Sequence, residues 1–184
     1  MGKLYLFDMI SLDGYFTGPK ENLDWHNVDE EFNKFAVTQL TDTETLVFGR
    51  ITYEMMAEFW TSDYAKQTDP VTANLMNTKP KIVVSHSLKH ADWNNTKLIK
   101  SNFGSVIFQL KQRSKKDIGI LGSSNLSVSF LKLGLIDEFR IMVNPVILGS
   151  GRSIFEGTEQ TFKIKLANVR EFKSGNVLLS YEKP

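Results

Sequence analysis

The chain has 184 residues, no cysteine, 22 basic and 21 acidic residues, and a formal net charge of +1. This length fits one domain spanning residues 1–184, and the composition is ordinary for a soluble globular protein. The absence of cysteine excludes disulfides, thiolate metal sites and a cysteine nucleophile, and the nearly balanced charge argues against nucleic acid as a partner.

Strands and helices alternate through the first two thirds of the chain. The apolar run Leu4–Ile10 predicts a central strand buried on both faces. Apolar residues at helical spacing predict a helix over Val28–Leu40. Thr45–Phe48 predicts a second buried strand, which leads through a glycine turn into a helix over Ile51–Phe59. The polar region that follows predicts a loop with a short helix at Val71–Met76.

The alternation continues after residue 80. The β-branched run Lys81–Val84 and the weaker Lys97–Ile99 predict strands, and Phe103–Gln112 predicts a helix. Ile118–Leu121 predicts another strand. It precedes a helix with an apolar stripe that Gly134 can end as a C-cap. The basic cluster Lys111–Lys116 is typical of the solvated C-terminal end of a helix.

The last third of the chain lacks a long helix. Three segments, Glu138–Leu148, Phe162–Phe172 and Asn176–Glu182, predict strands, and a short Lys173-Ser174-Gly175 connection joins the last two as a hairpin. The whole pattern therefore predicts an α/β fold with three layers, α/β/α, around a mixed sheet. We expect this sheet to be mostly parallel, with antiparallel strands at its C-terminal side.

Two turns of the predicted sheet have a sequence suited to phosphate. Gly49-Arg50-Ile51-Thr52 and Gly122-Ser123-Ser124-Asn125 each follow a buried strand and open a helix, where backbone N–H groups are unpaired. Glycine lets the backbone approach a ligand, while Arg50 and the hydroxyl groups supply further donors. Each turn alone equally fits a plain tight turn with a serine N-cap.

A third polar turn, Ser85-His86-Ser87, follows the strand Lys81–Val84. Because ligands of open α/β sheets bind at the carboxyl edge of the strands, three polar strand ends predict one binding edge. The G-x-G-x-x-G pattern is missing, so a nucleotide must bind by another arrangement. The three histidines have no metal-ligand spacing, and we expect no metal.

Acidic residues near the start of the first helix are candidates for proton transfer. Such residues commonly stabilise the helix dipole in solvent, but an acid half-buried beside Trp25 and Phe35 would have a raised pKa suited to proton donation. On a helical wheel Glu30 points away from the apolar face, while Asp29 and Glu31 flank it.

Five motifs occur in the order of a known superfamily: SLDGYFTG, LVFGRITYEMM, KIVVSHSL, IGILGSSNLSVSFLKLGLIDEFRI and NPVILGSGRSIF. In these motifs the chain resembles the dihydrofolate reductase-like superfamily, most closely the reductase domain of bacterial riboflavin biosynthesis. The resemblance spans Leu4 to Glu182. It implies a dihydrofolate reductase-like fold and an NADPH-dependent reductase similar to 5-amino-6-(5-phosphoribosylamino)uracil reductase, acting on a small heterocyclic or ribosylamine substrate.

The resemblance also implies roles for individual residues. Asp13 matches the start of the loop that closes over the nicotinamide, and Trp25 would line the substrate pocket, unless it is plain core packing. Counting from Trp25 selects Glu30 as the catalytic acid, and counting back from Phe35 selects Glu31, which the helical face favours. The residues that match the cofactor site are Gly49, Arg50, Thr52, Ser85, His86, Gly122, Ser123, Ser124, Asn125 and Leu126.

Two departures from the family pattern keep other functions open. Ser123 and Ser124 stand where the family usually has glycines, and the first strand carries Asp8 where the riboflavin enzymes have a basic residue. The serine-substituted turn and the absence of the arginine that serves the substrate phosphate in the riboflavin enzymes favour a non-catalytic nucleotide-binding module. A dihydrofolate reductase-type pterin reductase is a further alternative. No segment resembles a membrane span or targeting sequence, so we expect a cytoplasmic protein with no membrane partner. We expect a homodimer that binds a small-molecule substrate. A structural subunit, paired through the edge of the strand Phe139–Leu148, is the third reading.

Overall fold

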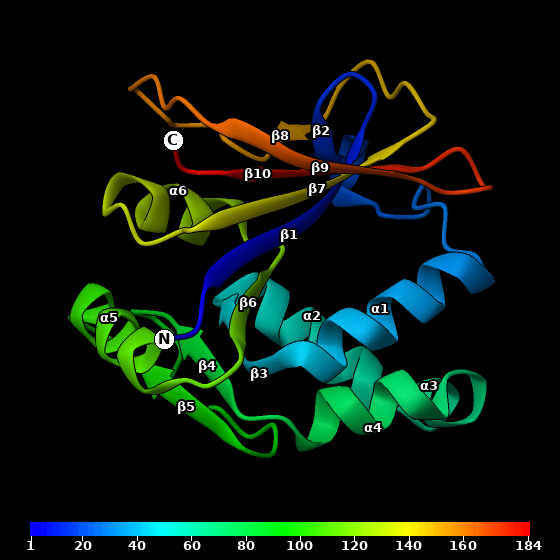
Figure 1. Ribbon diagram of the computed structural model, residues 1–184. Helices are drawn as coiled ribbons and strands as arrows, with labels where there is room; N and C mark the ends of the chain where they lie inside the picture. The colour runs from blue at the N-terminus through cyan, green and yellow to red at the C-terminus, as the bar shows by residue number, and fades with distance from the viewer.

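The computed structural model describes residues 1–184 and contains one eight-stranded mixed sheet between two layers of helices (Figure 1). The strand order is β5-β4-β3-β6-β1-β7-β10-β9. The strands are β1 (Leu4–Ser11), β3 (Thr43–Gly49), β4 (Lys81–Val84), β5 (Thr96–Ile99), β6 (Asp117–Leu121), β7 (Glu138–Asn144), β9 (Lys165–Glu171) and β10 (Val177–Glu182). All neighbours from β5 to β7 are parallel, and β10 pairs antiparallel with both β7 and β9. The predicted α/β class and mixed sheet are confirmed.

Helices cover both faces of the parallel strands. The helices are α1 (Glu30–Asp42), α2 (Arg50–Thr61), α3 (Asp63–Thr68), α4 (Pro70–Thr78), α5 (Phe103–Arg113) and α6 (Ser124–Lys132). In Figure 1, α5 and α6 lie on one side of the twisted sheet and α1 to α4 lie on the other. A small second sheet pairs β2 (Tyr15–Thr17) with β8 (Arg152–Ser153), and a 3₁₀ turn covers Pro19–Glu21. None of the helices has both the length and the apolar composition needed to cross a membrane.

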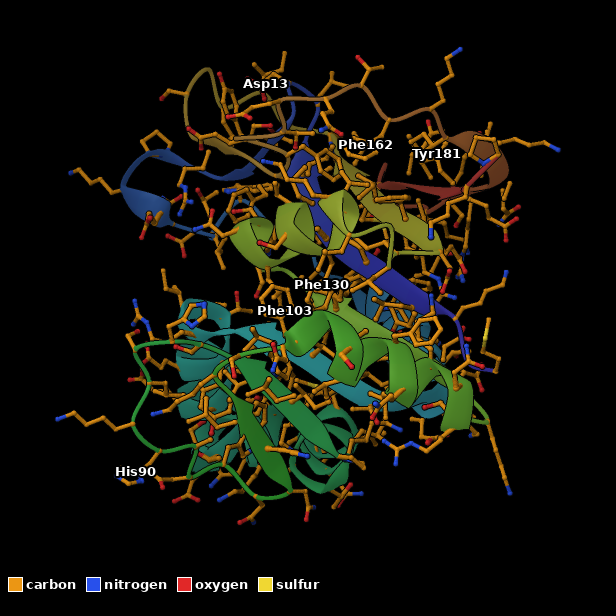
Figure 2. All side chains as sticks on the ribbon, turned by 90° about the vertical axis from the view of Figure 1, so that its left-hand side faces the viewer. Asp13, His90, Phe103, Phe130, Phe162 and Tyr181 are labelled. Carbon is orange, nitrogen blue, oxygen red and sulfur yellow. The ribbon has the colours of Figure 1, made fainter.

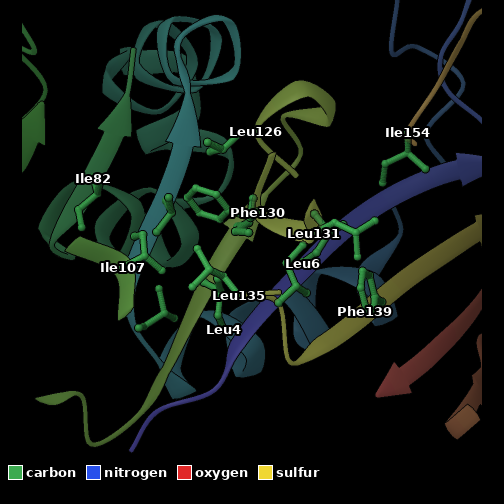
Figure 3. Close-up of a cluster of buried hydrophobic side chains, with 14 of the residues drawn as sticks. Leu4, Leu6, Ile82, Ile107, Leu126, Phe130, Leu131, Leu135, Phe139 and Ile154 are labelled. Atoms are coloured by element: carbon green, nitrogen blue, oxygen red, sulfur yellow. The ribbon is translucent and has the colours of Figure 1, made fainter. Parts of the chain in front are cut away.

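The largest hydrophobic cluster packs α5 and α6 against the sheet (Figure 3). Leu4 and Leu6 of β1 meet Phe130 and Leu131 of α6 there, and all four side chains are buried. A second cluster lies under α2 and α4, and a smaller one, with Met9 and Phe172, lies under α1. The apolar run of the first strand is therefore buried on both faces, as its sequence predicts.

The region after residue 61 differs from the prediction. It forms the two helices α3 and α4, where the sequence analysis expected a loop with one short helix. Side-chain caps start both helices, because Ser62 accepts a hydrogen bond from the Ala65 N–H and Asp69 accepts one from the Thr72 N–H. Such short helices contain few apolar residues, so the helical spacing of apolar residues that predicts a helix was weak here.

The strand proposed for dimer pairing is also placed differently. β7 ends at Asn144 and is hydrogen-bonded on one side to β1 and on the other to β10. The prediction that Phe139–Leu148 offers a free sheet edge was therefore wrong. The C-terminal edge of the sheet is β9, which has a neighbour on one side only.

Candidate functional site

Two helices begin side by side at the carboxyl edge of the sheet without a capping side chain. α2 follows Gly49 at the end of β3, and α6 follows Gly122 and Ser123 after β6, the next strand in the sheet. Neither helix has a side-chain cap hydrogen bond, and α5 likewise begins uncapped after β5. The first N–H groups of such helices have no partner within the helix, and the helix dipole makes this end attractive to an anion.

Ser123 joins the two turns. Its Oγ accepts a hydrogen bond from the Gly49 N–H at 2.9 Å and donates one to Thr52 Oγ1 at 2.8 Å. Gly122 and Ser123 both have left-handed backbone conformations, with φ of 60° and 68°. Such a conformation is strained for a serine, so the two hydrogen bonds help to hold it. The structure thus brings Gly49, Thr52, Gly122 and Ser123 together, as predicted.

The remaining residues of the two turns have distinct positions. Ser124 is buried and Asn125 is exposed in the first turn of α6, while the Leu126 side chain packs into the core. Arg50 is exposed at the start of α2, where its Nη1 lies 2.7 Å from Glu54 Oε2 one turn along the helix. Leu126 can therefore serve a ligand only through its backbone, whereas the Arg50 guanidinium is open to solvent.

The third polar turn lies at the same edge, because β4 is the other neighbour of β3. The buried Ser85 hydroxyl accepts hydrogen bonds from the Leu88 N–H at 3.0 Å and the Ser87 N–H at 3.2 Å. His86 is exposed. Ser85 therefore stabilises its own turn, and His86 is the member of this pair that is free to meet a ligand.

Asp13 and Trp25 lie in the loops above this edge. The Asp13 carboxylate accepts hydrogen bonds from the backbone N–H of Gly149 at 2.7 Å and of Leu148 at 3.1 Å. Hydrogen bonds from Ser11 and from these amides lower the pKa of Asp13. Trp25 is half-buried, and its Nε1 donates to the Asn22 carbonyl. Asp13 therefore ties the loop after β1 to the loop after β7, a role that the motif alone did not reveal.

The two candidate acids are in different environments. Glu30 is exposed and pairs with Lys34 at 2.7 Å, whereas Glu31 is half-buried. Glu31 Oε2 accepts a hydrogen bond from the Lys173 N–H at 3.0 Å, and its Oε1 lies 3.5 Å from Arg170 Nη2. Glu31 thus faces the β9–β10 hairpin, while Glu30 points to solvent as the helical wheel predicts.

An aromatic group lies beside Glu31 on the α1 face of the sheet. The ring of Phe7 is 6.5 Å from that of Phe32 and 5.8 Å from that of Phe35, between centroids. All three side chains are only partly buried, although Phe7 belongs to a central strand. Partly open aromatic rings at a sheet face are suited to a planar ring system.

Sequence reasoning did not assign a site role to Asp8. This side chain lies between Leu6 and Ile10 on the α6 face of β1, is buried, and has no hydrogen-bond partner for Oδ2. Burial raises the pKa of Asp8 to about 7. The preceding residue, Phe7, accepts a hydrogen bond from the Gly122 N–H through its carbonyl, so Asp8 adjoins the second turn. A single carboxylate inside an apolar strand is the signal that could have identified it.

Comparison with known proteins agrees with this architecture. Residues 3–178 match the family model of the RibD C-terminal domain. The chain belongs to this family. The relatives include the uncharacterized Bacillus subtilis proteins YyaP, 30% identical over 174 residues (94% of this chain and 90% of YyaP), and YwjB, 28% identical over 171 residues (92% of each chain).

Solved structures of RibD-type proteins share the fold. A putative riboflavin biosynthesis protein from Shewanella sp. PV-4 superimposes with a TM-score of 0.78 at 24% identity, covering 99% of both chains. The Thermotoga maritima diaminohydroxyphosphoribosylaminopyrimidine deaminase/5-amino-6-(5-phosphoribosylamino)uracil reductase gives a TM-score of 0.72 at 16% identity, and the match covers all of this chain but 57% of that one. Together with the family match, these structures show that the chain has the RibD C-terminal fold.

Proposed function

We propose that this RibD C-terminal domain is a cytoplasmic NADPH-dependent reductase that resembles 5-amino-6-(5-phosphoribosylamino)uracil reductase and acts on a small heterocyclic or ribosylamine substrate. The observation that carries the proposal is the pair of adjacent, uncapped helix starts joined through Ser123. Unpaired N–H groups at two neighbouring helix N-termini fit the phosphates of a dinucleotide.

The chain's own residues would bind and orient the two reactants. The N–H groups of the first turns of α2 and α6 bind the pyrophosphate, and the exposed Arg50 lies where it can pair with the 2′-phosphate. Bound NADPH supplies the hydride. Phe7, Phe32 and Phe35 orient a planar ring, and Glu31 supplies the proton from the start of α1.

A non-catalytic nucleotide-binding module is the second candidate. Ser123 fills space between the two turns with its side chain, and its hydroxyl makes both its hydrogen bonds to protein atoms. The pyrophosphate of a bound nucleotide would have to lie outside this bridge. A module of this kind would bind NADPH through the same N–H groups but would not consume it.

Titration with NADPH, followed by nicotinamide fluorescence, tests binding, and loss of NADPH absorbance against a panel of ribosylaminopyrimidines and dihydropterins tests turnover. We expect saturable binding and oxidation with at least one member of the panel. Binding without oxidation would support the module, and no binding at near-millimolar NADPH would exclude both readings.

The variant Arg50→Ala tests the role of the exposed guanidinium. Because it loses a charged contact, its affinity for NADPH should fall about tenfold more than its affinity for NADH. The control Arg113→Ala, at another exposed arginine, should change neither affinity.

A further inference from the structure

The acidic residue Asp8 lies in the middle of the central strand β1 and is only 7% exposed. Its Oδ1 accepts a hydrogen bond from the Met9 N–H at 2.9 Å, and its Oδ2 has no partner. Because burial raises the pKa of Asp8 to about 7, this carboxyl group changes its charge near neutral pH. A buried carboxyl group that the rest of the chain leaves unsatisfied is suited to a role in ligand binding.

Asp8 stands next to the glycine turn that opens α6. The parallel pairing of β1 with β6 reaches Phe7 opposite Leu121, and the Phe7 carbonyl accepts a hydrogen bond from the Gly122 N–H at 3.0 Å. Asp8 therefore lies opposite Gly122, and neighbouring strands are about 5 Å apart. The carboxyl group is thus one strand spacing from the turn that would bind the pyrophosphate.

The side chain of Asp8 is on the face of the sheet that α6 covers. Since side chains alternate along a strand, Asp8 shares this face with Leu6, which belongs to the same buried cluster as Leu131 of α6 (Figure 3). Figure 2 shows α6 in front of β1, with its Phe130 stacked on Phe103 of α5. Because α6 begins at the carboxyl edge and runs back along the sheet, Asp8 lies nearer than Leu6 to the uncapped start of this helix.

No cation of the chain compensates a negative charge on Asp8. The titratable residues of the elements around it are Tyr15 of β2, Asp117 of β6, Glu138 and Arg140 of β7, Arg152 of β8 and Lys132 of α6. None of them, nor the exposed Arg50 and His86 at the same edge, influences the pKa of Asp8, which depends on burial and the Met9 N–H alone. An ionised Asp8 would therefore act on a nearby phosphate from a buried position, where charges interact strongly.

We propose that NADPH binding is coupled to the uptake of a proton by Asp8, so that the chain binds the nucleotide tightly when Asp8 is neutral and weakly when it is ionised. This inference rests on the proposed cofactor site. The pyrophosphate is negatively charged, and a buried carboxylate one strand spacing from its turn repels it. By linkage, the bound nucleotide raises the affinity of Asp8 for its proton by the same factor. Binding therefore weakens as the pH rises, which makes the site sensitive to pH.

Titration with NADPH at about pH 7 and about pH 9, followed by nicotinamide fluorescence, tests the coupling. The charge of the 2′-phosphate is nearly constant in this range, because a phosphate monoester loses its last proton at about pH 6. The wild-type affinity should fall about tenfold between the two pH values. The affinity of Asp8→Asn should not change, because the amide has the same shape and no charge. The control Asp42→Asn, at an exposed residue that ends α1, should keep the wild-type dependence.

Calorimetry in two buffers of different ionisation enthalpy measures the proton directly. At about pH 8 the wild-type protein should take up more than about half a proton with each NADPH, and Asp8→Asn should take up none. A pH dependence that Asp8→Asn retains, or binding to wild type without proton uptake, would overturn the inference and leave the proposed cofactor site in place. Failure of both proteins to bind NADPH at any pH would overturn the proposed function together with this inference.

Discussion

The polar groups at the two edges of the parallel sheet differ in whether they have partners within the chain. At the amino edge, buried and half-buried charges are paired: Lys111 Nζ lies 2.6 Å from Asp137 Oδ2, and Arg140 Nε lies 2.7 Å from Glu138 Oε1. The buried Lys81 ammonium, at the start of β4, donates to three backbone carbonyls at the C-terminal end of α4. These contacts leave little at this edge for a ligand to bind.

At the carboxyl edge several polar groups have no partner. The helices α2 and α6 begin without caps, whereas Asp29, Ser62 and Asp69 cap α1, α3 and α4. Buried polar atoms without a hydrogen bond also gather on this side, among them Asp8 Oδ2, Thr17 Oγ1, His26 Nε2, Ser174 Oγ and Asn176 Oδ1. Since native proteins satisfy nearly all buried polar groups, the open edge is the one to search for a ligand.

The largest expected effect concerns Asp8. Because its pKa is raised to about 7, the folded state binds this proton more tightly than the unfolded chain, and stability falls as the pH rises from about 4 to about 7. Asp8→Asn removes the titration. The variant should therefore gain about 4 kcal/mol relative to wild type between about pH 4 and about pH 8. Urea unfolding at both values measures this, and a pH-independent difference would contradict it.

A change at the amino edge of the sheet, where the charges are paired, should affect stability alone. Lys111→Met removes the ion pair to Asp137 and the hydrogen bond to the Leu135 carbonyl, and it should lower the free energy of unfolding by about 3 kcal/mol. NADPH affinity should not change, as fluorescence titration would show. The exposed neighbour Lys115→Met is the matched control and should be silent in both measurements. Weaker NADPH binding by Lys111→Met would contradict the expectation that the amino edge takes no part in binding the cofactor.

A negative charge added at the uncapped start of α6 should weaken NADPH binding without lowering the free energy of unfolding. Asn125→Asp in the first turn of α6 should stabilise the unliganded helix by about 0.5 kcal/mol and weaken NADPH binding about tenfold by repulsion. Asn33→Asp, near the capped start of α1, should leave NADPH binding unchanged. If both variants bind NADPH equally well, α6 does not hold the phosphates.

The smallest expected effect separates the contribution of the Ser123 hydrogen bonds from that of its backbone strain. Ser123→Ala loses both hydrogen bonds but keeps the left-handed backbone strain, whereas Ser123→Gly loses the bonds and relieves the strain. The glycine variant should therefore be more stable than the alanine variant by about 1 kcal/mol, measured by thermal unfolding. Equal stability of the two variants would show that the backbone at residue 123 is not strained.

Much of the sheet followed from local patterns. The strands β1, β4 and β6 are continuous apolar or β-branched runs, and the glycines before α2 and α6 mark the turns correctly. The predicted strand over Phe162–Phe172 began three residues too early, because Phe162 packs onto the main core without joining the sheet. The short strands β2 and β8 depend on tertiary contacts and have no pattern of their own.

The candidate site was harder to predict than the fold. The glycine turns were identified, but the hydrogen bonds through Ser123 link residues 74 and 71 positions apart, a distance that no local pattern encodes. Lys111 was expected in solvent at the end of a helix, and it is buried against Asp137 instead. The roles of Glu31, Arg50 and Trp25 remain predictions, because position alone does not show what a side chain binds.

A crystal structure of the protein with NADPH tests the central claim most directly, that the open carboxyl edge between α2 and α6 holds the cofactor. We expect the pyrophosphate oxygens within hydrogen-bonding distance of the N–H groups that begin these two helices, beside an intact Ser123 bridge. Cofactor bound at another face of the molecule, or these N–H groups left without a ligand at saturating NADPH, would contradict the account.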